Sequence, residues 1–570
     1  MNGTATKAPT VTTTTSIRNV VLVGPSGSGK SRLFDHIVGS AVPARAPRSD
    51  GGDAGDATTG LRAATIATGS VVVTLLDAPG NPDFVGEVRA GLRAADAALF
   101  VVSAADGADA ASRALWHECA VVGMPRAVAI TALDARDADF TATLADCQAH
   151  FGAGIQPLGV PVAGDAGAVT SIADLLLGEI HDYSAGERTV RPAGPEHAEV
   201  FDTFRPSLIE GIIEESEDGT LMDRYLEGED LDFATLEKDL LTAIAHGTFH
   251  PVLPLSAETG AGVGVLMHLI EAAFPHPALH PLPTVTPVAG GTAVQLTADP
   301  DGPLVAEVVH TESDAYVGHR SLVRVFSGTL RGDRPVHVSG HLERLGVPTG
   351  EGHAPHDDDV RPGALAAPLD DELLPKTEAI AGEIVVVTKL GSAQTTDTLS
   401  SPDQPLLVTP WALPEALLPS AVAPSSRADE DRMPGAFREL AAEDPSLRIE
   451  HDAATGQVVL WTTGPAHLDL VLARLRTRFN VSVDQVPVQV ALKETATARA
   501  EALGRHVKQS GGHGQFAVCH LVMEPLPRGS GIEFAEVVVG GAVPRQFVGS
   551  VEKGVHTQLE KGLLAGWPVV

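Results

Sequence analysis

The N-terminal part of the chain alternates short apolar runs with amphipathic segments, which is the pattern of a parallel sheet covered by helices. The apolar runs, each of which predicts a buried strand, lie at residues 20–23, 71–76, 97–102 and 126–130. A helix-like segment follows the first run at 32–38, and another at 265–274 precedes a proline break. We therefore predict an α/β domain over residues 17–280.

The pattern changes several times along the rest of the chain. Residues 135–250 interrupt the α/β domain with amphipathic segments that are acidic on one face, and they predict a helical insert. Short strands separated by turns over 281–410 predict a β-barrel, and helices flanking strands over 411–484 predict an α/β sandwich. Residues 485–570 begin a last, incomplete α+β domain, and the Thr-rich residues 1–16 predict a disordered leader. The predicted fold class is a multidomain chain built in this order.

The sequence Gly-Pro-Ser-Gly-Ser-Gly-Lys-Ser at 24–31 stands between the first strand and its helix, which is the context of a phosphate-binding loop. Successive main-chain N–H groups and a helix N-terminus enclose the phosphates, Lys30 neutralises them, and the Ser31 hydroxyl is a ligand for Mg²⁺. A chance glycine-rich turn is the alternative that this context disfavours. The predicted nucleotide-binding residues here are Gly24, Ser26, Gly27, Ser28, Gly29, Lys30 and Ser31.

A second motif, Asp77-Ala78-Pro79-Gly80, ends the strand at 71–76. An aspartate at the end of an apolar strand can hold Mg²⁺, usually through water, and a glycine three residues later can offer its amide to a γ-phosphate. The same residues also suit an ordinary turn. Together with the phosphate-binding loop they indicate a nucleotide-dependent switch.

Composition limits the class of partner. The formal net charge of −33 argues against DNA binding, but residues 485–570 carry eight Lys and Arg against seven Asp and Glu and can approach RNA without strong repulsion. The three cysteines show no metal-ligand spacing and indicate a reducing compartment. No apolar run reaches the roughly 18 residues of a membrane span. We expect a soluble, cytoplasmic monomer without a membrane partner.

Signatures in order along the chain resemble those of elongation factor G. The residues Asp77-Ala78-Pro79-Gly80-Asn81-Pro82-Asp83-Phe84 are similar to the Asp-Thr-Pro-Gly-His-x-Asp-Phe of translational GTPases. Further segments resemble the second, third and fourth domains of that family: Arg324–Gly328, Ala442–Leu447, Thr463–Asp469, Lys508–Phe516 and Leu564–Val569. The resemblance implies a P-loop GTPase domain that binds GTP or GDP with Mg²⁺. It also implies the ribosome, through its RNA and stalk proteins, as the partner.

The guanine-reading segment departs from the family. The family has Asn-Lys-x-Asp where this chain has Thr131-Ala132-Leu133-Asp134. Asp134 can still accept hydrogen bonds from guanine, and Ser256-Ala257 matches the last guanine contact of the family. We estimate a loss of about 1–3 kcal/mol, or roughly tenfold to a hundredfold in affinity, so some guanine preference is expected to survive.

The catalytic segment departs as well. Asn81, beside Gly80, replaces the histidine that positions the attacking water in the family. Asparagine can bind a water but cannot take its proton, and losing such a group removes roughly 10²–10⁴ in rate. Compositional drift against Asn and Lys accounts for Ala132, but it does not account for a lost histidine in a chain with 22 of them.

The first switch of the family, Arg-Gly-Ile-Thr, is best matched by residues 56–61. Thr59 is the predicted Mg²⁺ ligand, with Thr58 as the alternative, although the register places Gly60 where the threonine belongs. The preceding Ser49–Gly55 is rich in Gly and Asp and is expected to be mobile.

In the family, the loop at 508–516 lies at the domain tip that enters the decoding site. The predicted RNA contacts are Lys508, Gln509, Ser510, Gly511 and Gly512. The chain stops at Val570, where the family begins a further strand. We expect a fragment of a longer protein, with a natively truncated paralogue as the alternative.

Three functions remain open from the sequence. The first is a GTP-binding translation factor that acts on the ribosome with weak or lost stimulated hydrolysis. The second is an active GTPase translocase or a ribosome-protection factor of the tetracycline-resistance type. The third is a nucleotide-sensing binding protein that has left the ribosome, for which the net charge of −33 is the main support.

Overall fold

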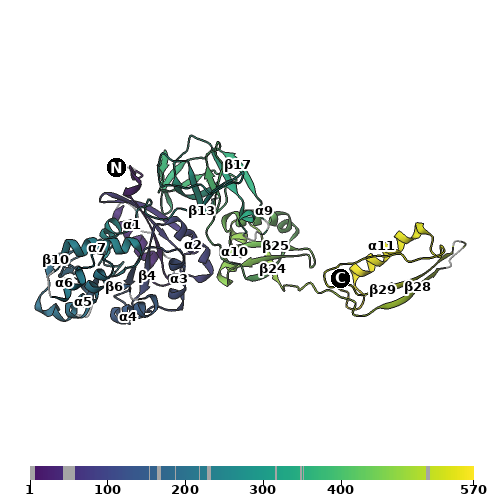
Figure 1. Cartoon of the computed structure of the whole chain (residues 1–570), viewed down its shortest axis with the longest axis horizontal. Helices are drawn as coiled ribbons and strands as arrows, with labels where there is room; N and C mark the ends of the chain where they lie inside the picture. Colours follow the sequence, from purple (N-terminus) through teal and green to yellow (C-terminus); the bar gives the residue numbers. More distant parts are fainter. Residues whose placement is uncertain are drawn as a thin grey trace. The chain divides into compact units, whose positions relative to one another are not determined.

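The computed structural model describes residues 7–570 apart from 43–57, 153, 164–168, 187, 217, 228–230, 232, 315–317, 347–349, 351, 509–511 and 513. The chain divides into two compact units (Figure 1). The first comprises residues 1–450 and 458–486, and the second comprises residues 451–457 and 487–570.

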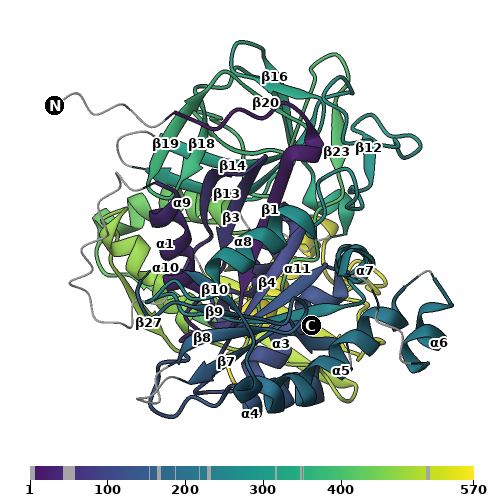
Figure 2. The same ribbon diagram turned by 90° about the vertical axis from the view of Figure 1, so that its left-hand side faces the viewer.

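A mostly parallel sheet forms the centre of the N-terminal domain. Its strands run in the order β2-β3-β1-β4-β5-β11-β6, and only β2 is antiparallel to its neighbour. The strands are β1 (Ile17–Val23), β2 (Arg62–Thr68), β3 (Val71–Asp77), β4 (Ala97–Ser103), β5 (Arg126–Thr131), β6 (Ile155–Pro157) and β11 (His250–Pro254). The helices of this domain are α1 (Lys30–Ala41), α2 (Val85–Ala94), α3 (Ala110–Val121), α4 (Phe140–Phe151) and α8 (Val263–Ala272). Figure 2 shows β1, β3 and β4 together at the centre of the domain.

Every residue of β1, β3, β4 and β5 is buried, which confirms the strands predicted from the apolar runs. A strand of a parallel sheet covered on both faces needs apolar side chains at successive positions, and these runs supply them. Residues 7–16 differ from the expected disordered leader. Thr14–Ser16 form a short 3₁₀ helix before β1, and Ala8 packs against the main core.

The insert contains a sheet that the sequence analysis did not predict. Residues 159–192 form a four-stranded antiparallel sheet in the order β10-β9-β8-β7. Its strands are β7 (Gly159–Ala163), β8 (Val169–Asp174), β9 (Glu179–Asp182) and β10 (Thr189–Pro192). The helices α5 (Ala198–Glu214), α6 (Leu221–Leu226) and α7 (Phe233–His246) follow. The predicted helical insert over 135–250 therefore has its helices but also contains a sheet that was not expected. These strands are short, and their buried and exposed residues do not alternate regularly. Their sequence therefore lacks the apolar–polar alternation with a period of two that predicts a strand. In addition, α4 and β6 belong to the central domain.

The next domain is built from antiparallel strands around a separate apolar core, as its pattern of short strands predicts. The strands are β12 (Val285–Pro287), β13 (Val305–Asp314), β14 (Gly318–Ser327), β15 (Thr329–Arg331), β16 (Val336–Gly340), β17 (His356–Val360), β18 (Leu365–Leu369), β19 (Glu372–Lys376), β20 (Glu378–Ile380), β21 (Ile384–Thr388), β22 (Thr398–Ser400) and β23 (Leu406–Val408). A 3₁₀ helix, η4 (Leu342–Leu345), follows β16. We refer to residues 281–410 as the β domain.

Buried ion pairs join the β domain to the N-terminal domain. Arg324 from β14 donates to Asp96 at 2.7 Å, and both side chains are buried. Arg93 from α2 pairs with Glu307 of β13 at 2.6 Å. Burial raises the pKa of Glu307, and the adjacent Arg93 guanidinium opposes that shift. Removing one partner of such a pair leaves an uncompensated buried charge, so these contacts fix where the β domain sits.

The third domain is a four-stranded sheet in the order β25-β26-β24-β27 with two helices. Its elements are β24 (Leu418–Pro424), α9 (Arg427–Glu443), β25 (Arg448–Asp452), β26 (Gln457–Thr462), α10 (Pro465–Thr477) and β27 (Val483–Val486). Its two helices and its strands agree with the pattern of helices flanking strands that the sequence predicts.

The second unit contains a hairpin of β28 (Ala500–Lys508) and β29 (Gln515–Met523), followed by α11 (Arg545–Lys561) (Figure 1). The carboxylate of Glu494 accepts hydrogen bonds from the amides of Leu563, Leu564, Ala565 and Trp567, at 2.7–3.2 Å. These bonds anchor the C-terminal segment. None of the helices in the described ranges is long and apolar enough to cross a membrane.

Candidate nucleotide site

The phosphate-binding loop has the backbone geometry that its sequence predicts. Gly27 and Gly29 adopt φ of 86° and 83°, a left-handed conformation that glycine adopts without strain. Gly24 has no room for a side chain, because a Cβ there would lie 2.3 Å from the carbonyl oxygen of Val101. The loop leads directly into α1, whose first amides, from Lys30 onward, have no carbonyl partner within the helix. This arrangement favours an anion at the loop.

Lys30, Ser31 and Asp77 meet at the carboxyl end of β3. Burial lowers the pKa of Lys30, and the nearby Asp77 opposes that shift. Burial also raises the pKa of Asp77, while Lys30 and a hydrogen bond from Ser31 lower it. No described group donates a hydrogen bond to Oδ1 of Asp77, although this oxygen is buried. A buried carboxylate oxygen without a donor, beside a serine hydroxyl, fits a Mg²⁺ ion held directly or through water.

Of the two threonines predicted for the first switch, Thr58 lies beside Ser31. The Thr58 and Ser31 hydroxyls are 3.2 Å apart. Thr59 instead lines a small crevice that also includes Asp83, Glu87 and His467. The expected mobile segment Ser49–Gly55 lies outside the described residues.

Gly80 and Asn81 lie beside the phosphate-binding loop, and their polar groups form hydrogen bonds with neighbouring main-chain amides. The carbonyl of Gly80 accepts a hydrogen bond from the Ser26 amide at 3.2 Å. A Cβ at residue 80 would lie 2.5 Å from the main-chain nitrogen of Ser26, so only glycine fits this close approach. Asn81 caps the 3₁₀ helix η2 (Pro82–Phe84), because its side-chain oxygen accepts from the Asp83 amide at 3.0 Å.

The base-side segments meet at the carboxyl ends of β5 and β11, which are adjacent and parallel. Asp134 is exposed there, Ser256 is buried, and the partly exposed Ala257 follows Ser256. Thr131 has a role that sequence reasoning missed. Its hydroxyl donates to the carbonyl of Ser28 in the phosphate-binding loop at 2.5 Å. Although the family asparagine is absent, this hydroxyl ties the base-side segment to the phosphate-binding loop.

Asp83 connects the switch to the third domain, a contact that the sequence did not reveal. Its carboxylate accepts from the amide of Ala466 in the first turn of α10 at 2.7 Å, and its carbonyl accepts from the Thr463 hydroxyl. A carboxylate at a helix N-terminus satisfies an otherwise unpaired amide. The segment that carries Asn81 is thus fastened to α10.

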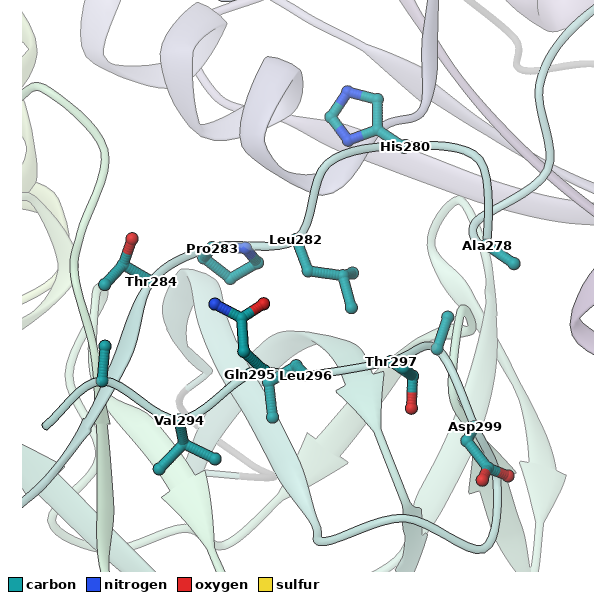
Figure 3. Close-up of a pocket in the computed structure, with 12 residues that line it drawn as sticks. Ala278, His280, Leu282, Pro283, Thr284, Val294, Gln295, Leu296, Thr297 and Asp299 are labelled. Carbon is teal, nitrogen blue, oxygen red and sulfur yellow. The ribbon is translucent and has the colours of Figure 1, made fainter.

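A cavity with a volume of about 610 Å³ lies away from the nucleotide site. It is lined by residues of two segments, 278–284 and 293–299, in the connection to the β domain. Figure 3 shows Leu282 and Gln295 projecting into it from opposite sides. None of the predicted site residues lines this cavity.

The predicted RNA contacts lie partly outside the described residues. Lys508 ends β28 and is exposed, and Gly512 adopts φ of 88° in the turn. Gln509, Ser510 and Gly511 are not among the described residues.

The central sheet, the phosphate-binding loop and the Ser31–Asp77 pair define a P-loop nucleotide-binding domain of the GTPase class. Three family models match the chain: the elongation factor Tu GTP binding domain over residues 15–276, elongation factor G domain III over 413–487 and elongation factor G domain IV over 488–570. The chain belongs to the elongation factor G-like family of translational GTPases.

Individual relatives agree with the family models. An elongation factor G-like protein of Mycobacterium tuberculosis (strain H37Rv) is 47% identical over 578 residues, which cover 99% of this chain and 80% of the relative. The corresponding protein of Thermotoga maritima is 30% identical over 561 residues, which cover 97% and 79%. A solved structure from Thermus thermophilus matches with a TM-score of 0.76 and 30% identity, and the match covers 98% of this chain and 80% of that one.

Proposed function

We propose that this protein is a GTP-binding translation factor that acts on the ribosome and has weak or lost ribosome-stimulated GTP hydrolysis. Lys30 and the amides at the start of α1 bind the phosphates. Ser31 and Asp77 hold Mg²⁺, which supplies positive charge to the phosphate oxygens when bound. Asp134 and Ser256 recognise the guanine base.

The local hydrogen bond of Asn81 carries the hydrolysis part of the proposal. Its side-chain oxygen already accepts from the Asp83 amide at 3.0 Å, and Asp83 in turn caps α10. The side chain that would have to orient a water is therefore engaged in holding its own turn. An amide also cannot take a proton from water, so the barrier stays high even where a water is bound.

The experiment restores the missing group. GTP hydrolysis is measured with and without ribosomes for the wild-type protein, Asn81→His and Asn81→Ala. We expect roughly 10²–10⁴-fold faster stimulated hydrolysis in Asn81→His and no gain in Asn81→Ala, which also loses the cap. Wild-type hydrolysis as fast as that of Asn81→His would show that the site does not need an imidazole.

A second candidate is a nucleotide-sensing protein that does not bind ribosomes, and the net charge of −33 favours it. Co-sedimentation with ribosomes in GTP, GDP or a non-hydrolysable analogue separates the two candidates. Nucleotide-dependent sedimentation supports the translation factor, whereas its absence supports the sensor. Fast hydrolysis together with sedimentation supports the remaining alternative, an active translocase or a ribosome-protection factor.

A further inference from the structure

Arg62 places an additional positive charge at the nucleotide site. It is the first residue of β2 and lies opposite Asp77 in the antiparallel register of β2 and β3. Its Nη1 is 3.3 Å from Oδ2 of Asp77, the carboxylate whose other oxygen is buried without a donor. The guanidinium therefore stands next to the group that would hold Mg²⁺.

Two other carboxylates fix the position of this guanidinium. Nη2 of Arg62 is 2.7 Å from Asp35 of α1, and Nε is 2.9 Å from Asp370 in the turn after β18. The contact to Asp370 is bidentate, since Nη2 also donates to its second oxygen at 3.0 Å. The guanidinium carbon lies 4.6 Å from the centre of the Phe34 ring. A side chain that is 17% exposed and held on four sides has little freedom to leave the site.

Asp370 belongs to the β domain, so the charge at the nucleotide site is shared between domains. Its backbone adopts φ of 57°, and its amide donates to the carbonyl of Ala63 in β2 at 2.8 Å. The turn that carries Asp370 is thus attached to the same strand as Arg62. The Asp370 carboxylate neutralises part of the positive charge of Arg62, so the guanidinium acts less strongly on Asp77.

We propose that Arg62 is a fixed cation of the nucleotide site that makes nucleotide binding less dependent on Mg²⁺, and that Asp370 of the β domain sets how strongly its charge acts there. This inference rests on the proposed nucleotide binding. The guanidinium attracts the phosphates. It also neutralises part of the negative charge of Asp77, which weakens the attraction of this carboxylate for a divalent ion. A unit charge about 6 Å from a divalent ion changes the ion's affinity about tenfold even at the dielectric constant of water.

The test measures the affinity for a fluorescent GDP analogue over a series of free Mg²⁺ concentrations, including chelator alone. Arg62→Gln removes the charge and leaves a shorter, neutral polar side chain. We expect it to weaken Mg²⁺-free binding about tenfold and to lower the half-saturating Mg²⁺ concentration about tenfold. Asp370→Asn should shift both quantities in the opposite direction by a few fold, because it frees Arg62 charge. Asparagine also tolerates the positive φ of this position.

Arg62→Lys tests the charge itself, because it keeps the positive charge but loses the bidentate contact to Asp370; it should shift the half-saturating Mg²⁺ concentration less than Arg62→Gln does. Unchanged Mg²⁺ dependence in both Arg62→Gln and Asp370→Asn would overturn the proposal. If Arg62→Gln does not fold, the opposite shift of Asp370→Asn remains decisive. Failure of the wild-type protein to bind the analogue at any Mg²⁺ concentration would instead refute the proposed function.

Discussion

Replacing Thr131 by valine removes one hydroxyl from the contact between the base-side segment and the phosphate-binding loop, at nearly constant volume. The hydroxyl donates to the carbonyl of Ser28 at 2.5 Å and lies 3.3 Å from the carbonyl of Val102. Thr131 is 2% exposed. Water therefore cannot readily take the place of the lost donor in the folded site.

The expected cost follows from leaving the Ser28 carbonyl without its donor. A buried polar group that loses its partner costs about 1–3 kcal/mol. In the free protein the loop can relax to recover part of this cost, whereas bound nucleotide requires the loop in place. At most, the whole of this free-energy cost appears as weaker nucleotide binding. The dissociation constant then rises roughly 5–150-fold.

The assay is GDP affinity at saturating Mg²⁺, measured by fluorescence titration for the wild-type protein, Thr131→Val and Thr131→Ser. Serine keeps the hydroxyl and should bind GDP within about threefold of the wild-type protein, since only a methyl group is lost. If Thr131→Val binds GDP as tightly as the wild-type protein, the hydroxyl does not organise the site, and the structural role assigned to Thr131 is wrong.

Two further predictions concern packing and pH. Gly24→Ala forces a Cβ to 2.3 Å from the Val101 carbonyl and should destabilise the protein by about 1–3 kcal/mol in urea denaturation, whereas Gly39→Ala, which meets nothing within 4 Å, should not destabilise it. Burial alone would lower the pKa of His467, but the Asp444 carboxylate at 2.8 Å has the stronger effect, so the pKa of His467 is raised. Burial alone would raise the pKa of Asp444, but His467 and other hydrogen bonds lower it below its ordinary value. The stabilisation from this pair should be complete between about pH 4 and 6.5 and should decline as the pH falls below or rises above that window; equal pH dependence in His467→Gln would contradict this.

The parts of the fold that the sequence revealed are those that depend on contiguous residues. The phosphate-binding loop needs glycine at particular positions for backbone reasons, and Gly24, Gly27 and Gly29 occupy them. The apolar runs became strands because a sheet covered on both faces requires them. The strands over 159–192 escaped prediction, since their alternation is interrupted by exposed and partly buried positions.

The parts of the site that the sequence did not reveal depend on side chains that meet across long separations. Arg62 meets Asp370, which is 308 positions away, and Asp83 meets Ala466, which is 383 positions away. No local pattern encodes such pairs. The position of Thr58 beside Ser31 could not be predicted for a related reason, because the side chains of neighbouring residues in an irregular segment have no fixed directions.

The departures from the family differ in what replaces the lost group, and this difference matters for function. At Thr131 a hydroxyl still supplies a donor to the phosphate-binding loop, so drift in composition can be tolerated without loss of the loop geometry. At Asn81 the side chain supplies a cap and no base. Arg62 adds a charge whose position depends on the β domain. Several contacts thus hold the phosphate-binding loop and its neighbours in place, whereas the position of the family histidine carries an asparagine that caps its own turn. This difference supports the proposed function, in which the bound nucleotide controls the factor more than its rate of GTP hydrolysis does.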